Sequence, residues 1–143
     1  MWLTDRVVLL GEIVRSNGFE AKKALGKIME KGAEKHDFLL DDSALAYKSP
    51  GGLVIITGCS HAGICNIVEQ AREVCGEDRV VDIVGGLHLL DPSAVQLQGT
   101  LDYLQALRPG SMHAGHCKDL RSKIALSRVV ELKEVGVGLT LEY

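Results

Sequence analysis

The sequence has little of what membrane-spanning or nucleic-acid-binding proteins need. No apolar run approaches the roughly 20 residues of a membrane-spanning helix, and residues 1–6 lack the basic and apolar regions of a signal peptide. Only 4% of the residues are aromatic and the net charge is −3, whereas nucleic-acid-binding domains usually present a basic face and stacking aromatic side chains. We therefore expect a cytoplasmic protein that binds neither a membrane nor nucleic acid.

CxxC spacing is also absent, so the four cysteines do not indicate a disulfide framework in a reducing compartment. Cys65 and Cys75 fall in a helical pattern and fit as small buried hydrophobic residues. Cys59 and Cys117 stand near histidines, and each could be a metal ligand, a reactive thiol or a packed side chain. A Cys–His nucleophile pair is one alternative, although no third residue is evident to orient the base.

The 143 residues suit one domain, and a hydrophobic content of 46% supports a packed core. Segment 14–36 is polar and lysine-rich without clear periodicity, which predicts a loop. Two short strands joined by a turn are predicted within 38–47. The other predicted strands are 6–13, 53–57, 80–84, 112–117 and 135–143, and the predicted helices are 64–74, 95–107 and 120–130. This alternation of strands and helices predicts an α/β layered domain.

Four of the five histidines occur where a predicted strand ends, and these are His61, His88, His113 and His116. Ligands of α/β sheets bind outside the carboxyl ends of the strands. If the strands are parallel, His61, His88 and His116 therefore lie near one site, and neutral imidazole is the commonest side-chain ligand of divalent metals. A single histidine in such a place is more often a hydrogen-bonded loop residue, and His36 in the charged segment fits that interpretation.

Three blocks of sequence resemble a branch of the metallo-β-lactamase superfamily. They are Gly52–Ile64 (GLVIITGCSHAGI), Gly85–Leu89 (GGLHL) and His116-Cys117. This branch is often labelled dihydropterin-aminobenzene ribofuranosyl-phosphate synthase-like, or superfamily II metal-dependent hydrolase. The resemblance covers nearly the whole chain, most firmly 38–143, and the GCSHAGI block is its most specific part.

The resemblance implies an α/β fold, namely the C-terminal half of a four-layer αβ/βα metallo-β-lactamase sandwich. Residues 1–143 would form a single partial domain, because the HxHxDH metal motif of the family's N-terminal half does not occur in the sequence. The resemblance carries over His61 and His116 as metal ligands and His88 as a catalytic-site residue, with Cys59 and Cys117 as weaker candidates. The cofactor would be a divalent metal, with zinc first and manganese or iron as alternatives.

A second departure from the branch is Lys118, which stands where threonine is common after His-Cys and places a cation near the expected metal site. The implied function is the C-terminal portion of a metal-dependent hydrolase. It would activate metal-bound water or orient a small-molecule substrate, for which a pterin or a phosphate-containing compound is a candidate.

The alternative is a catalytically inactive remnant or an obligate subunit. Half of a sandwich leaves one sheet face uncovered, and such a face favours association with a second copy or with a chain that carries the N-terminal half. A third interpretation is a cysteine-dependent enzyme that uses Cys59 or Cys117. Loss of activity on thiol alkylation, with metal content unchanged, would favour it.

Overall fold

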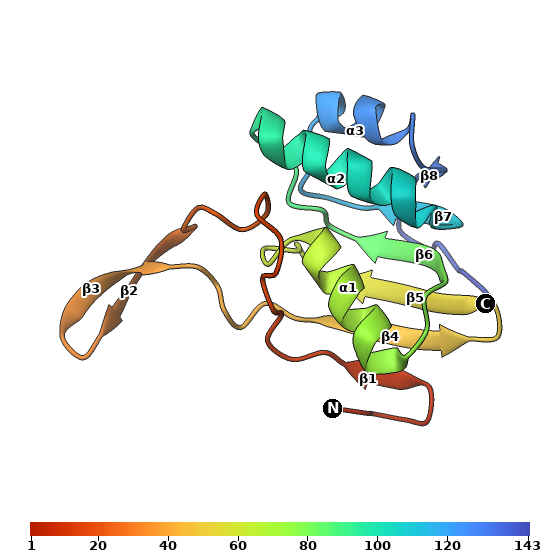
Figure 1. Ribbon diagram of the computed structural model, residues 1–143, viewed down its shortest axis with the longest axis horizontal. Coiled ribbons are helices and arrows are strands. Elements are labelled where there is room, and N and C mark those ends of the chain that lie inside the picture. The colour runs from red at the N-terminus through yellow and green to blue at the C-terminus, as the bar shows by residue number, and fades with distance from the viewer.

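A computed structural model describes residues 1–143 as one six-stranded mixed sheet, three helices and a projecting two-stranded arm (Figure 1). The strands are β1 (Val7–Leu9), β2 (Gly26–Glu30), β3 (Ala33–Asp37), β4 (Ala44–Ser49), β5 (Gly52–Thr57), β6 (Val80–Gly85), β7 (Ser111–Ala114) and β8 (Leu132–Lys133). The helices are α1 (Ile64–Cys75), α2 (Ala94–Leu107) and α3 (Leu120–Leu126). No helix is both long enough and apolar enough to cross a bilayer.

The strand order in the main sheet is β1-β4-β5-β6-β7-β8. β1, β4 and β5 pair antiparallel, whereas β5, β6, β7 and β8 pair parallel. The parallel strands are joined through α1, α2 and α3, which is the predicted α/β alternation. As a result, the carboxyl ends of β5, β6 and β7 meet at one edge of the sheet.

The hydrophobic core lies between the sheet and helices α1 and α2, which lie side by side over one face of the sheet (Figure 1). Helix α1 forms as predicted, because its apolar residues recur on one side and are buried there. It ends at Gly76, whose left-handed conformation has φ = 60°. The strand predicted at 53–57 forms as β5, with Leu53 and Ile55 fully buried, but it is not buried on both faces as its apolar run indicated, because Ile56 is 43% exposed.

The start of α1 is held by a carboxylate from a distant part of the chain. Both oxygens of buried Glu20 accept backbone hydrogen bonds, from Cys65 at 3.1 Å and from Asn66 at 3.1 Å. The side-chain oxygen of Asn66 in turn accepts hydrogen bonds from the backbone N–H groups of Ser16 and Asn17. Residues 16–20 are therefore tied to the helix N-terminus, where a negative charge is favoured.

The prediction of a loop for 14–36 is wrong in its second half, because β2 and β3 form an antiparallel hairpin. Its two-residue turn, Lys31-Gly32, has φ = 51° and 81°, the positive values of a type I′ turn. Ion pairs between Lys27 and Glu34 and between Lys35 and Glu30 join the strands. Nearly every residue of the hairpin is exposed, so no alternation of apolar and polar residues marked it in the sequence.

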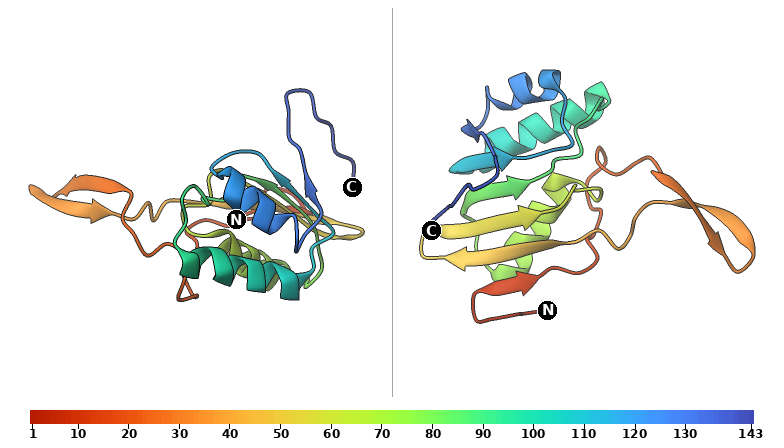
Figure 2. Two further views of the ribbon diagram at one scale, coloured as in Figure 1. Left: turned by 90° about the horizontal axis from the view of Figure 1, so that it is seen from above. Right: turned by 180° about the vertical axis from the view of Figure 1, so that it is seen from behind.

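Two further strand predictions also fail. Residues 38–43 form no strand, and only β4 falls in the expected 38–47 region. Residues 135–143, predicted as a closing strand, are irregular and loop out from the sheet face opposite the helices (Figure 2). Gly136 and Gly138 interrupt this segment, and Gly138 has φ = 87°, which no strand accommodates.

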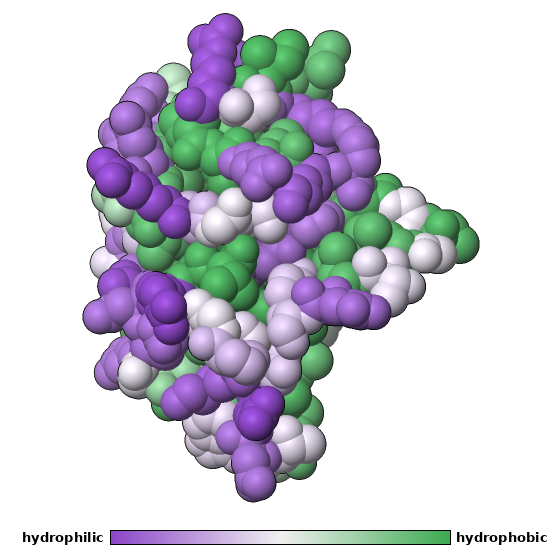
Figure 3. Space-filling model, turned by 90° about the vertical axis from the view of Figure 1, so that its right-hand side faces the viewer, coloured by the Kyte–Doolittle hydropathy of each residue, from purple (hydrophilic) through white to green (hydrophobic).

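The C-terminal segment partly covers an apolar sheet face. It encloses a cavity of about 560 Å³ whose lining includes Val54, Ile56 and Val84 from the sheet and Leu139 and Tyr143 from the segment. Hydrophobic side chains also gather on the projection at the right of Figure 3, on the side of the sheet away from the helices. Helices thus cover one face only, which corresponds to two layers of a four-layer sandwich.

Candidate metal centre

The loops that follow β5, β6 and β7 are joined to one another by backbone hydrogen bonds. Gly86 N–H donates to the carbonyl of Gly58 at 2.7 Å, and Gly115 N–H donates to that of Gly85 at 2.8 Å. Farther out, Leu89 N–H donates to the carbonyl of Cys117 at 2.7 Å. These bonds hold the three strand ends together, as expected for a ligand site of a parallel sheet.

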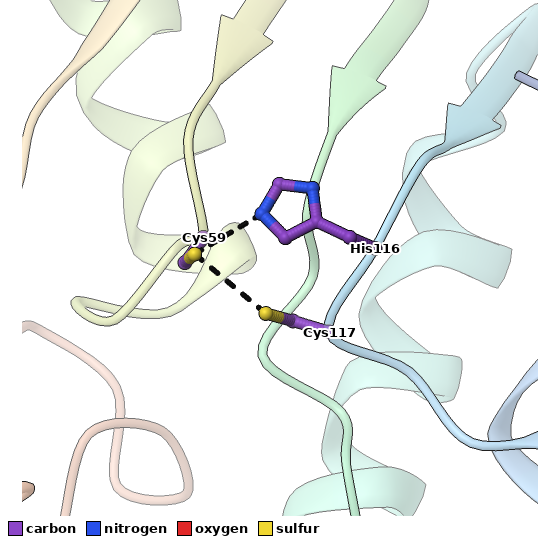
Figure 4. Close-up of side chains that lie close together, drawn as sticks. All are labelled: Cys59, His116 and Cys117. Carbon is purple, nitrogen blue, oxygen red and sulfur yellow. Dashed lines mark hydrogen bonds between the residues drawn. The ribbon is translucent and has the colours of Figure 1, made fainter. Parts of the chain in front are cut away.

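Cys59, His116 and Cys117 bring their donor atoms together at this edge (Figure 4). The Cys59 thiol lies 3.0 Å from Nε2 of His116, and the Cys117 thiol donates to the Cys59 sulfur at 3.6 Å. All three donor atoms lie within 4.8 Å of one another. Both thiols are free and half-buried, and His116 is exposed. The two cysteines that were the weaker candidates thus contact each other and a predicted ligand.

His61 and His88 form a second pair in the adjoining loops. Their ring centroids are 4.7 Å apart, with the edge of one ring toward the face of the other. Nδ1 of His61 is buried and has no hydrogen-bond partner. Burial, and secondarily the His61 ring, hold the pKa of His88 below its usual value, while Asp42 opposes the shift. His88 is therefore neutral at pH 7, which is the form that binds a metal.

Four non-glycine residues in these loops have left-handed backbone conformations. Ser60, His88 and Cys117 are three of them, with φ of 60°, 49° and 53°, and Asp91 in the loop after β6 is a fourth, with φ of 48°. Such conformations cost free energy and concentrate at functional sites. The buried hydroxyl of Ser60 donates to the carbonyl of Gly86 at 2.6 Å and so fixes the loop that carries His61 and Cys59. Sequence reasoning missed Ser60, because nothing in its spacing distinguishes it from any loop serine.

Gly86 makes room for the His116 ring. A Cβ added at Gly86 would lie 2.7 Å from Nε2 of His116 and 2.7 Å from the carbonyl oxygen of Gly58. Both distances are too short for a carbon contact, since non-bonded atoms pack at about 3.5–4.0 Å. The glycine therefore lets the ring lie across the end of β6 and reach Cys59.

His113 does not join the site, although it was one of the four histidines predicted at strand ends. It lies within β7, where its neighbours Met112 and Ala114 face the helices and its own side chain faces the opposite side. Its Nδ1 is 2.6 Å from Oδ2 of buried Asp82, and the Tyr143 hydroxyl donates to the same oxygen at 2.6 Å. Asp82 therefore belongs to a cluster with His113 and Tyr143 on this face of the sheet.

The Lys118 ammonium is tied to the backbone, because it donates to the carbonyl of Ala114. Burial lowers its pKa, and Lys123 lowers it further.

Asp42 is a residue that the sequence placed only in a turn. Its carboxylate accepts a hydrogen bond from Ala62 N–H at 2.8 Å, which positions it beside the loop of His61.

The donors at this edge fit a divalent metal. They are imidazoles and thiols, which suit zinc and other borderline or soft ions, and one imidazole nitrogen is buried without a partner. The structure divides them into Cys59–His116–Cys117 on one side and His61–His88 on the other. His61 and His116, both predicted as metal ligands, are not in the same close group of donor atoms.

The chain is similar to proteins of known sequence and structure. No family model matches the chain. The chain is 31% identical over 124 residues to the 7,8-dihydropterin-6-methyl-4-(beta-D-ribofuranosyl)-aminobenzene-5'-phosphate synthase of Methanocaldococcus jannaschii, covering 85% of this chain and 42% of the relative. It is 27% identical to an uncharacterised protein of the same organism, covering 86% of this chain and 44% of the relative. The chain thus spans less than half the length of these curated relatives.

A solved structure is similar over the whole chain. It is the crystal structure of Tm1679, described as a metal-dependent hydrolase of the β-lactamase superfamily. The TM-score is 0.87 at 28% sequence identity, and the match covers 100% of this chain and 56% of the other. The partial coverage fits the predicted correspondence to one half of the fold.

Proposed function

We propose that the chain, whose fold is that of a metal-dependent hydrolase of the β-lactamase superfamily, forms one edge of the active site of such a hydrolase. His61 and His116 are the metal ligands in this proposal, and His88 contacts the metal or the substrate. The observation that carries it is the meeting of these residues at the carboxyl edge of the parallel strands, with Nδ1 of His61 buried and unpartnered. The remaining ligands come from a segment with the HxHxDH motif, which this chain lacks.

A bound divalent metal would lower the pKa of its water to near 7 and polarise the substrate. The chain's own residues prepare the site for it. His88 is held neutral by burial and by His61, and the Ser60 hydroxyl fixes the loop that carries Cys59 and His61. Zinc suits the imidazole donors of this proposed site best, and manganese or iron are the alternatives.

The proposed substrate is a small molecule that carries a pterin or a phosphate group. The name of the 31% identical relative describes a dihydropterin ribofuranosyl-aminobenzene phosphate, which supports this class. Substrates of the whole enzyme would depend on both halves of the site, because this chain lacks the HxHxDH motif.

Metal content tests the proposal directly. We expect the purified chain to hold about one or more ions of zinc, manganese or iron, and we expect His61→Ala and His116→Ala each to hold measurably less than the parent chain, because each removes a ligand. Elemental analysis after gel filtration in metal-free buffer is the measurement. His36→Ala is the matched control, since this histidine lies on the exposed hairpin and should leave the metal content unchanged. Equal metal content in all four proteins would contradict the proposal, as would none in the parent chain.

A second candidate function, an association subunit without activity of its own, is favoured by the apolar sheet face. Ile56 is 43% exposed there, and Val54 and Val84 line the same cavity under the C-terminal segment. The occupant we propose is a second copy of the chain or a chain that carries the N-terminal half of the fold. Burying such a face is favourable at about 25 cal/mol per Å² of apolar surface.

Association through this face should depend on Ile56. We expect the parent chain to sediment as a dimer at micromolar concentration and Ile56→Lys to sediment as a monomer, because a lysine cannot be buried unpaired in the interface. Sedimentation velocity is the measurement. Val95→Lys is the control, because Val95 is 69% exposed on α2, on the other side of the sheet. A monomeric parent chain would restrict this face to a partner of different sequence, and a dimer unaffected by Ile56→Lys would refute the assignment of the face.

A further inference from the structure

We propose that Cys59, Cys117 and His116 form a thiolate-rich metal site, selective for Zn²⁺ and other thiophilic ions, that this chain completes without a partner. The inference goes beyond the proposed hydrolase site, which uses neither thiol. It starts from the three donor atoms that meet within 4.8 Å at the ends of β5 and β7. Figure 4 shows that Cys59 faces both of the other side chains across the end of β6.

The distances between the donors match a zinc coordination sphere. With Zn–S of about 2.3 Å and Zn–N of about 2.05 Å, tetrahedral angles place two sulfurs about 3.8 Å apart and a sulfur and a nitrogen about 3.5 Å apart. The Cys59 and Cys117 sulfurs are 3.6 Å apart, and Nε2 of His116 is 3.0 Å from the Cys59 sulfur. The imidazole would have to move about 0.5 Å away from the Cys59 sulfur to reach the spacing of a zinc site.

The backbone holds the three donors in place before any ion binds. Cys117 is in a left-handed conformation, with φ = 53°, and its carbonyl accepts a hydrogen bond from Leu89 N–H. The loop of Cys59 is fixed by the Ser60 hydroxyl, which donates to the carbonyl of Gly86. A site organised in this way does not have to order its ligands when it binds, so less of the binding free energy is lost.

The donor set determines which ions fit. Thiolates favour Zn²⁺ and Cu⁺, whereas Mg²⁺ and Mn²⁺ prefer oxygen ligands. On binding, each thiol releases its proton to solvent as its sulfur–metal bond forms, so no oxidant or reductant is needed. Two cysteines and one histidine leave a fourth position for water, an arrangement that occurs in catalytic zinc sites. That position faces solvent here, because His116 is exposed and the two thiols are half-buried.

His116 is shared between this site and the proposed hydrolase site, and His61 distinguishes them. His61 contacts His88 and contributes no donor atom to the close group of Cys59, His116 and Cys117. Removal of His61 should therefore weaken a site built on histidines and leave a site built on thiolates intact. This difference allows one inference to fail while the other stands.

Cobalt substitution is the test. The full chain is reduced, freed of metal, and titrated with Co²⁺, whose thiolate complexes absorb strongly in the near ultraviolet. We expect a charge-transfer band that saturates at one Co²⁺ per chain and disappears when Zn²⁺ is added in equal amount. Cys59→Ser and Cys117→Ser should each reduce the band by about half, because each removes one of two thiolates. Excess Mg²⁺ should not displace the cobalt.

Two variants serve as controls, with circular dichroism to verify folding. Cys75→Ser, at the end of α1 and away from the site, should keep the full band, and His61→Ala should keep it as well. Cobalt binding without a thiolate band, or a band that survives both Cys59→Ser and Cys117→Ser, would overturn this inference and leave the hydrolase proposal standing. Absence of cobalt binding would overturn it too. A band lost in His61→Ala would show that His61 is required and that the thiol site is not separate.

Discussion

Glu20→Ala should unfold about 2 kcal/mol more easily than Glu20→Gln, because alanine leaves buried backbone donors without an acceptor. The Glu20 carboxylate accepts hydrogen bonds from the backbone of Cys65 and Asn66 and from the side chain of Asn17. The glutamine carbonyl oxygen can keep those of Asn66 and Asn17, whereas alanine keeps none. Urea denaturation monitored by circular dichroism would measure the difference. Equal stability of the two variants would mean that water replaces the carboxylate at the start of α1.

The charge of Glu20 should add a pH dependence. Burial raises the pKa of this carboxyl above its ordinary value of 4.5, although the backbone hydrogen bonds from Cys65 and Asn66 oppose the shift. The folded protein then holds this proton more tightly than the unfolded chain. Its contribution to stability is complete below about pH 4.5 and is lost as the pH rises through the raised pKa. The parent chain should therefore lose stability relative to Glu20→Gln over that interval, and parallel curves would contradict the shift.

Gly86→Ala should weaken metal binding by about 10- to 100-fold without removing a ligand, which is the usual cost of disturbing groups that orient metal ligands. The new Cβ would meet Nε2 of His116 and the carbonyl oxygen of Gly58, both at 2.7 Å. The carbonyl belongs to a backbone that is hydrogen-bonded to Gly86 itself, so the imidazole is the group that moves. Competition with a chromophoric zinc chelator gives the affinity.

Gly115→Ala is the matched control for Gly86→Ala. Gly115 is next to His116 in the chain, but its added Cβ would have no neighbour nearer than 3.8 Å, which is ordinary contact. Its zinc affinity should equal that of the parent chain. Wild-type affinity in Gly86→Ala would show that His116 binds in a different orientation or does not bind at all. Thermal melting of both variants separates this local effect from a loss of folding.

The parts of the fold that the sequence predicted are those with dense apolar patterns. The continuous run of β5 and the helical spacing in α1 each allow one arrangement that buries most of the apolar side chains, and both elements form where predicted. The hairpin of β2 and β3 has no buried face, so its pairing depends on a turn and on charge pairs that periodicity does not detect. The final segment has apolar residues, but two glycines and the absence of a neighbouring strand leave it irregular.

At the candidate site, the sequence predicted the neighbourhood but not the contacts. Parallel strands bring His61, His88 and His116 to one edge, as expected from their positions after strands. Their division into a histidine pair and a thiol–imidazole group depends on how the chain turns beyond each strand. That direction is set by left-handed residues such as His88 and Cys117, whose conformations no spacing rule reveals.

The projecting hairpin has a practical consequence for engineering this chain. Gly26 and Asp37 are paired across its base, and such partners in an antiparallel ladder have Cα atoms about 4.5–5.5 Å apart. The chain therefore leaves and returns at nearly the same point, and the sheet register is set elsewhere, by the pairing of β1 with β4. A short turn or a whole reporter domain could replace residues 27–36 while the metal-binding edge keeps its shape, which makes the arm a natural grafting position.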